Sequence, residues 1–230
     1  MYNKIYRTIL ILAFVLFVTS SMALAVSPRG AFDPASGITP LNATSLRTAI
    51  DSVPKLDLND TERDGLLYMA EEEKLARDVY ENSYETHQLP IFQNIASAEQ
   101  THIDAVKVLI DRYDLEISST DERGLFVDAK LQTLYGELVE RSNESLKQAL
   151  QVGALIEEID IVDLQTHMNE TDNDDIILVY ENLEKGSRNH LRAFVGTMER
   201  YGFAYLPQVL SQEEFDEIAN SPTERGLYLS

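Results

Sequence analysis

Apolar residues recur every three or four positions in four long stretches of residues 60–201, which is the spacing of one face of an α-helix. The second stretch directly follows Pro90, and proline is favoured as the first residue of a helix. The four stretches begin at Leu66, Phe92, Leu146 and Ile176. This pattern predicts four long helices and few strands, so the predicted fold class is all-α.

The predicted connections between these helices differ in length. Residues 87–90 join the first two helices and residues 168–172 join the last two, so each pair is predicted to be an antiparallel hairpin. Residues 114–142 lie between the hairpins, and 129–141 within them has the pattern of a short helix. Two helical hairpins joined by one long crossover are typical of a ferritin-like four-helix bundle.

The segments outside the four stretches predict an arm and a short helix. Residues 26–58 hold four of the seven prolines, which indicates an exposed arm or linker with one helical turn near Ser45–Ser52. Ser211 and Glu214 have the spacing of a capping box and predict a last short helix. The predicted boundaries are 26–58 for the arm, 59–220 for the bundle and 221–230 for a C-terminal tail.

The N-terminus has the pattern of a secretory signal. Lys4 and Arg7 precede an unbroken apolar run, and Ala23-Leu24-Ala25 has the small-x-small pattern of a signal-peptidase site. Residues 1–25 are therefore predicted to be a signal peptide, and the protein is predicted to be exported, either secreted or associated with the cell envelope. The alternative is an uncleaved N-terminal anchor, which would then be the chain's contact with a membrane.

The chain is strongly acidic, with 19 Lys and Arg against 39 Asp and Glu and a formal net charge of −20. Removing residues 1–25 takes away two basic residues and no acidic one, so the exported part carries −22. Such a charge opposes binding to nucleic acid, which needs a basic face to neutralise phosphates. The sequence indicates no particular protein partner and is compatible with a homodimer.

Carboxylates and histidines interrupt the apolar stripes near their middles. Glu73, Glu99 and Glu157 each lie on one stripe, His102 follows Glu99 by about one helical turn, and His190 lies on the fourth stripe. A buried charge is costly unless something compensates it, and the chain has no cysteine ligands. These residues therefore predict a carboxylate–histidine site for Fe or Mn ions. A hydrogen-bonded Glu–His core without metal is the alternative.

Four segments carry a resemblance to a known family. Residues 73–80 resemble the first metal-binding helix of rubrerythrin-type ferritin-like proteins, where Glu, Ala and Tyr recur at these offsets. Residues 99–102, 153–160 and 186–194 resemble the corresponding motifs of the other three helices. Together the segments most closely resemble domain of unknown function 2202, an uncharacterised ferritin-like family of archaea and bacteria, over about residues 60–220.

The resemblance implies a role for each residue of the predicted site. Glu73 and Glu157 would be terminal ligands of two metals, and Glu99 would bridge them. His102 would bind the metal held by Glu73, and His190 the metal held by Glu157.

The sequence departs from the usual fourth-helix motif at Ser187, where ferritin-like proteins have a second bridging Glu. Asp160 lies one turn from Glu157 and is the predicted replacement, whereas Glu158 and Glu184 are less well directed. Because of this departure, an asymmetric site and a single-metal site are both alternatives to a symmetric two-metal centre.

Besides the export predicted from residues 1–25, the resemblance implies a protein that binds one or two Fe or Mn ions. It would be redox-active towards Fe(II), O₂ or peroxide, which is the activity of a ferritin-like oxidoreductase. The alternative is a metal-free helical module for binding or envelope association, whose polar core only fixes the register of the helices. His87 and His167 lie near predicted helix ends and are predicted to be surface or capping residues.

Overall fold

The structure, a computed structural model, describes residues 43–116 and 120–228, and these contain seven helices and no strand. The predicted all-helical class is confirmed. The predicted signal peptide, 1–25, and the arm up to residue 42 lie outside the described residues. Among the described helices none is both long enough and apolar enough to cross a membrane. Their bounds are α1 Ala43–Ser52, α2 Asp60–His87, α3 Pro90–Arg112, α4 Ala129–Glu144, α5 Leu146–Met168, α6 Asp174–Arg200 and α7 Gln212–Asn220.

Local sequence signals account for where the first two long helices begin and end. Asn59 caps α2 through a capping box, in which Glu62 N donates to Asn59 Oδ1 at 3.0 Å and Asn59 N donates to Glu62 Oε2 at 2.8 Å. Gln88, with φ of 53°, ends α2 in the left-handed region. Pro90 then opens α3, as its sequence position predicts.

The helices α4 and α5 meet at a serine cap. The predicted helix 129–141 continues to Glu144, and Ser145 caps α5 by accepting a hydrogen bond from Gln148 N at 3.2 Å. The long helix therefore begins after Ser145 rather than after Ser142 as the sequence suggested. Ser142 is instead buried, and its hydroxyl contacts that of Ser83 of α2 at 2.6 Å.

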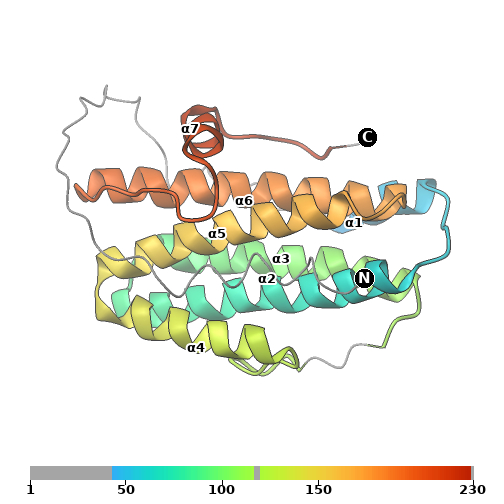
Figure 1. The fold of residues 1–230 in the computed structure, drawn as a ribbon, viewed down its shortest axis with the longest axis horizontal. Coiled ribbons are helices and arrows are strands. Elements are labelled where there is room, and N and C mark those ends of the chain that lie inside the picture. Colours follow the sequence, from blue (N-terminus) through green and yellow to red (C-terminus); the bar gives the residue numbers. More distant parts are fainter. Residues whose placement is uncertain (1–42, 117–119, 229–230) are drawn as a thin grey trace. The chain divides into compact units, whose positions relative to one another are not determined.

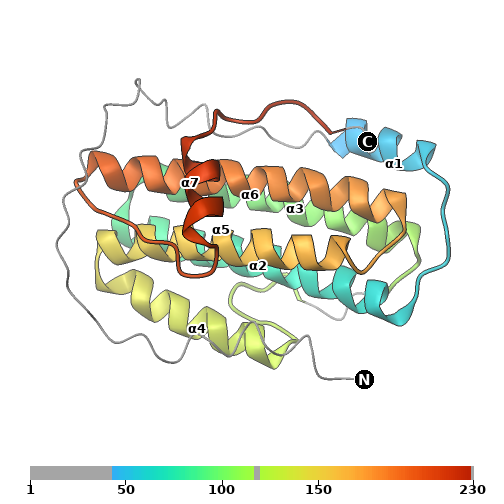
Figure 2. The same ribbon diagram turned by 45° about the horizontal axis from the view of Figure 1, so that its top comes forward.

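The four long helices pack along one another in pairs. α2 packs against α3 and α5 against α6, while α2 also contacts α5 and α3 also contacts α6. Figures 1 and 2 show these four helices side by side, with α4 against α2 and α5. This arrangement gives each long helix two long neighbours, so its inward stripe is buried along most of its length.

Two apolar clusters fill the space between these helices. One surrounds Phe92 and Phe194, and the other surrounds Leu66 and Leu109. On α2, α3 and α6 a stretch with buried polar side chains separates the positions of the two clusters; these stretches are 71–74, 98–103 and 184–190. On α5 the buried acids Glu157, Glu158 and Asp160 come just before Ile161, the last buried residue of the first cluster on that helix, and Leu164 of the second cluster follows. The polar groups therefore meet at one level, between two apolar blocks that keep water away from them.

Candidate metal centre

The five residues predicted to bind metal converge in the interior. Glu73, Glu99 and His102 form one group whose potential ligand atoms lie within 4.8 Å of one another, and Glu99, Glu157 and His190 form a second. Each of the five side chains belongs to a residue no more than 3% exposed. Because Glu99 is common to both groups, the two are joined through one carboxylate.

Both histidines direct Nδ1 towards carboxylate oxygens. His102 Nδ1 lies 3.1 Å from Glu73 Oε2 and 2.9 Å from Glu99 Oε2. His190 Nδ1 lies 3.0 Å from Glu99 Oε1 and 3.4 Å from Glu157 Oε2. The two imidazole rings stack at 5.3 Å between centroids. Each histidine thus lies between two glutamates, with Glu99 using one oxygen for each.

Small and aromatic residues hold this arrangement in place. A Cβ at position 186 would lie 2.5 Å from His102 Nε2, so Gly186 of α6 provides the space for that ring. The hydroxyl of Tyr80 in α2 donates a hydrogen bond to Glu157 Oε1 at 2.5 Å. The ring of Tyr80 also packs on Phe194 at 5.3 Å, which closes the centre on that side with apolar surface.

Burial and mutual charge set the protonation of the cluster. Burial raises the pKa of Glu73 and of Glu157 to about 7 each, although a neighbouring histidine opposes the rise. Burial acts to raise the pKa of Glu99 as well, but His190 and His102 outweigh it and lower that pKa below its ordinary value. Burial lowers the pKa of His190, yet the charges of Glu99 and Glu157 raise it to about 10. Without a cation, the cluster therefore holds protons at neutral pH.

Unsatisfied atoms indicate that the residues present fit a metal ion. Glu73 Oε1, Glu99 Oε1 and His190 Nδ1 are buried and have no hydrogen-bond partner among the residues that the structure describes. Glu99 Oε1 and His190 Nδ1 lie close together but do not meet with hydrogen-bond geometry. Buried polar atoms are normally satisfied, and hard oxygen and imidazole donors suit Fe or Mn. The donor set therefore fits one or two such ions between these side chains.

Asp160 supplies a carboxylate near the position where the fourth helix has Ser187. The Ser187 hydroxyl donates a hydrogen bond to Asp160 Oδ2, and both residues are buried. Asp160 Oδ1 has no hydrogen-bond partner in the described part of the chain. Burial raises the pKa of Asp160, and Glu73 and Glu157 are close enough to raise it further. Asp160 belongs to neither three-residue group, so it borders the centre without completing it.

Two glutamates close in sequence to site residues, Glu71 and Glu158, bind loops and not the centre. Glu71 accepts backbone hydrogen bonds from Val127 N at 2.8 Å and Asp128 N at 2.9 Å. Glu158 accepts backbone hydrogen bonds from residues 208–210. Glu184 pairs with Arg188 at 2.8 Å. These acids therefore face away from the centre. Of the consecutive glutamates 71–73 and 157–158, only Glu73 and Glu157 belong to the centre.

Two acids that were not predicted to lie near the centre are Glu72, which is buried, and Asp163, which is partly buried. The Tyr68 hydroxyl lies 3.4 Å from Glu72 Oε1 and 3.5 Å from Asp163 Oδ2, which places the two acids together between α2 and α5. The signal for Asp163 in the sequence is the series Glu157, Asp160 and Asp163, in which each acid lies one turn from the next.

The remaining two histidines lie outside the centre. His87 Nε2 contacts Ser142 O at 2.8 Å, near the end of α2. The prediction that His167 is a surface or capping residue needs correction, because its ring is partly buried. It lies between Gly65, Tyr68 and Tyr180, and a Cβ at Gly65 would be 3.0 Å from its Nδ1.

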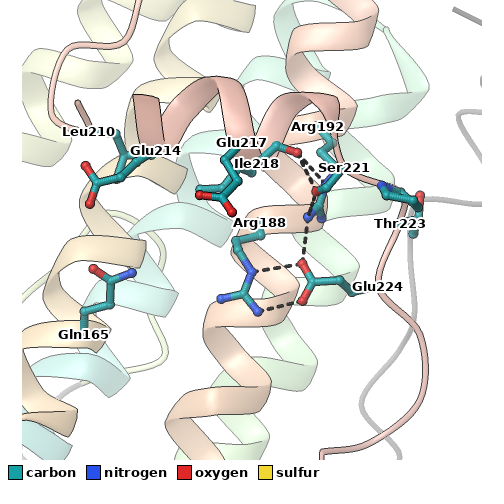
Figure 3. Close-up of a pocket in the computed structure, with 11 residues that line it drawn as sticks. Gln165, Arg188, Arg192, Leu210, Glu214, Glu217, Ile218, Ser221, Thr223 and Glu224 are labelled. Atoms are coloured by element: carbon teal, nitrogen blue, oxygen red, sulfur yellow. Dashed lines mark hydrogen bonds and ion pairs between the residues drawn. The ribbon is translucent and has the colours of Figure 1, made fainter. Parts of the chain in front are cut away.

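A surface cavity of about 570 Å³ lies elsewhere, beneath α7. Figure 3 shows that its arginines are engaged within the chain. Arg188 forks onto both carboxylate oxygens of Glu224 at 2.9 and 2.7 Å, and Arg192 donates to Glu224 and Ser221. These contacts fasten the C-terminal segment to α6, and the cavity has no part in the buried cluster.

Comparisons with known proteins agree with this arrangement of helices. The chain matches the family described as "Uncharacterized protein domain (DUF2202)" over residues 62–222, a range that includes all five residues of the centre. It is 51% identical over 179 residues to "Uncharacterized protein MJ0754" of Methanocaldococcus jannaschii, covering 77% of this chain and 97% of that protein. The crystal structure of hypothetical protein MJ0754 from Methanococcus jannaschii is similar with a TM-score of 0.74, at 51% sequence identity, covering 75% of this chain and 99% of that chain. The chain therefore belongs to the DUF2202 family.

Proposed function

We propose that this protein binds one or two Fe or Mn ions at the centre formed by Glu73, Glu99, His102, Glu157 and His190. The observation that carries the proposal is the pair of buried three-residue groups joined by Glu99. Three glutamates and two histidines with unsatisfied atoms would be an expensive core without a cation to compensate the charge.

The surrounding architecture supports assignment to the ferritin-like superfamily. Each of the long helices α2, α3, α5 and α6 contributes to the centre, and residues 113–145 connect the first pair to the second. We infer a four-helix bundle with a long crossover between α3 and α5, in which inward carboxylates and histidines build the metal site.

The chain's own residues would hold and shield the ions. Glu73 and Glu157 would each bind one ion, Glu99 would bridge, and the two histidines would complete the donor sets. Tyr80 orients Glu157 through its hydrogen bond, and Ser187 orients Asp160 through another. Iron or manganese bound here would supply one-electron chemistry towards O₂ or peroxide, so a redox activity on Fe(II), O₂ or peroxide is the class of reaction we propose.

Elemental analysis of the purified protein tests this proposal. After growth in medium supplemented with iron and manganese, we expect about one or two ions of Fe or Mn per chain. His102→Ala and His190→Ala should lose this metal, whereas His87→Ala, a histidine outside the centre, should retain it. Metal-free wild-type protein would support the alternative of a helical module whose polar core serves only structure.

We also propose that the protein acts outside the cytoplasm. The support is the sequence of residues 1–25, a basic start followed by an apolar run and a small-x-small site. Fractionation of cells that produce the full chain, with N-terminal sequencing of the product, would distinguish a cleaved signal from an anchor. Recovery of the intact chain from the cytoplasm would contradict export.

A further inference from the structure

Three acids outside the five-residue centre lie near one another on α2 and α5, and two of them are buried while Asp163 is partly buried. We call Glu72, Asp160 and Asp163 the acidic seam. Glu72 is 4% and Asp160 is 5% exposed, and the Tyr68 hydroxyl contacts both Glu72 and Asp163. Asp160 lies one turn after Glu157 and Asp163 one turn after Asp160, so the seam leads along α5 from the centre towards the end of that helix.

The acidic seam has hydroxyl partners in Tyr68 and Ser187 but no cationic one. Among the described residues, Glu72 Oε2 and Asp160 Oδ1 have no partner that meets hydrogen-bond geometry. Within the described part of the chain, no lysine or arginine lies within ion-pair distance of any seam residue. Buried carboxyl groups that no cationic side chain compensates are costly to a fold, so their presence together indicates a role for their oxygen atoms at this place.

The seam connects the centre to the end of the helices at which α2 begins and α5 ends. Asp160 is the member nearest the centre, and its charge interacts with those of Glu73 and Glu157. At the other end Asp163 interacts with His167, one turn along α5. His167 and Glu170 line a small cavity of about 10 Å³ with Glu62 and Gly65, which is room for about one water molecule.

The opposite side of the centre offers no comparable set of oxygen atoms. There Tyr80 packs on Phe194, and Phe194 packs on Phe92 at 5.9 Å between ring centroids. A hydrated cation would lose its water ligands against these rings and gain nothing in return. The seam, in contrast, presents carboxylate oxygens that can replace water ligands one after another.

We propose that the acidic seam is the route by which divalent cations pass from the His167 end of the bundle to the buried centre. This inference rests on the proposed function, because it requires that the centre binds a cation. Rows of carboxylates serve this purpose in cation-selective pores, where negative charge attracts the ion and several weak contacts let it move on.

Uptake kinetics of Co²⁺ by metal-free protein test the route. Stopped-flow absorption of bound Co²⁺ gives the rate of uptake, and titration of the same sample gives the number of ions bound at equilibrium. Glu72→Gln and Asp163→Asn each keep the side-chain shape and replace a carboxyl group by an amide, which cannot become an anionic ligand. The matched control is Asp64→Asn, because Asp64 is an exposed acid on the same end of α2.

We expect both seam variants to slow uptake about tenfold or more, because each loses a carboxyl group that could bind the passing ion, and loss of an acidic group beside a metal site commonly costs about 10–100-fold. The number of ions bound at equilibrium should stay at the wild-type value, and Asp64→Asn should match wild type in both measurements. Urea unfolding of the metal-free variants checks their folding. It should show no large loss of stability, because each amide nearly keeps the shape of the acid and still has an oxygen that can accept the hydrogen bond of Tyr68.

The outcomes separate this inference from the proposed function. Wild-type uptake rates in both seam variants would overturn the route while leaving the metal centre intact. Slow uptake together with fewer ions at equilibrium would also overturn it, because the seam would then be a holding site. A wild-type protein that binds no Co²⁺, Fe or Mn would overturn the proposed function and the route with it.

Discussion

Glu157 and Glu158 are consecutive residues of α5, both buried, and their carboxylates serve different parts of the molecule. Glu157 Oε2 lies 3.4 Å from His190 Nδ1 in the centre. Glu158 Oε2 accepts hydrogen bonds from Val209 N at 2.7 Å and Leu210 N at 2.9 Å. Successive side chains of a helix point about 100° apart, so when Glu157 faces the centre, Glu158 faces a different side of α5.

The two glutamates should therefore have separable mutant effects. Glu158→Ala leaves backbone N–H groups of the 208–210 segment without their acceptor, so the free energy of unfolding should fall by about 3 kcal/mol. Metal content per folded chain should be unchanged. Glu157→Gln should instead reduce metal content. Urea unfolding and elemental analysis of both variants check this, and loss of metal in Glu158→Ala alone would contradict the assignment.

Gly186 should be required for the orientation of His102. In Gly186→Ala the added Cβ would lie 2.5 Å from His102 Nε2, so the ring must move and metal content should fall. Gly136 of α4 is the control, because a Cβ there meets nothing within 4 Å. Gly136→Ala should keep the metal and stabilise the protein by about 0.5–1 kcal/mol through helix propensity. Full metal content in Gly186→Ala would show that His102 is not a ligand in this orientation.

Metal affinity should rise with pH. Burial raises the pKa of Glu73 and Glu157 to about 7, so below that pH these carboxylates hold protons that a cation must displace. Isothermal titration calorimetry in buffers of different ionisation enthalpy should show proton release on binding, and apparent affinity should increase between about pH 5 and 8. Affinity that is independent of pH over this range would contradict binding at these residues.

The stability of the metal-free protein should change with pH in the opposite sense. Glu73 and Glu157 have folded pKa values raised from 4.5 to about 7, so the folded state binds protons more tightly than the unfolded state does. Their contribution to stability is present below about pH 4.5 and is lost as the pH rises through 7. Urea unfolding at several pH values checks this, and Glu73→Gln should weaken the dependence.

The contact of Glu224 with α6 should hold the C-terminal segment. Although partial burial opposes it, hydrogen bonds from Arg188, Tyr228 and Arg192 lower the pKa of Glu224 to about 2. The contact should therefore be complete above the ordinary value of 4.5 and be lost as the pH falls towards 2. Glu224→Gln should speed amide hydrogen exchange at residues 222–228 without changing metal content. Unchanged exchange there would show that other contacts suffice.

The sequence by itself determined the helices, because their signals are local. Apolar spacing predicted the four long helices, Pro90 marked the start of α3, and Ser211 with Glu214 marked α7. It also predicted which five residues would face inward, because a polar residue in an apolar stripe shares the direction of its neighbours. Helix ends were less certain, since Ser142 and Ser145 are both plausible caps and only packing decided for Ser145.

Tertiary structure decided what the acids beside the centre do. Glu71, Glu72 and Glu73 are consecutive and chemically alike. Glu71 nevertheless binds a loop, Glu72 lies in the acidic seam and Glu73 belongs to the centre. Asp160 meets Ser187 because α5 and α6 pack together, which no local pattern encodes. Helical periodicity determines on which side of its helix a side chain lies. Its partner depends on which neighbouring helix or loop occupies that direction, and only the folded chain supplies that neighbour.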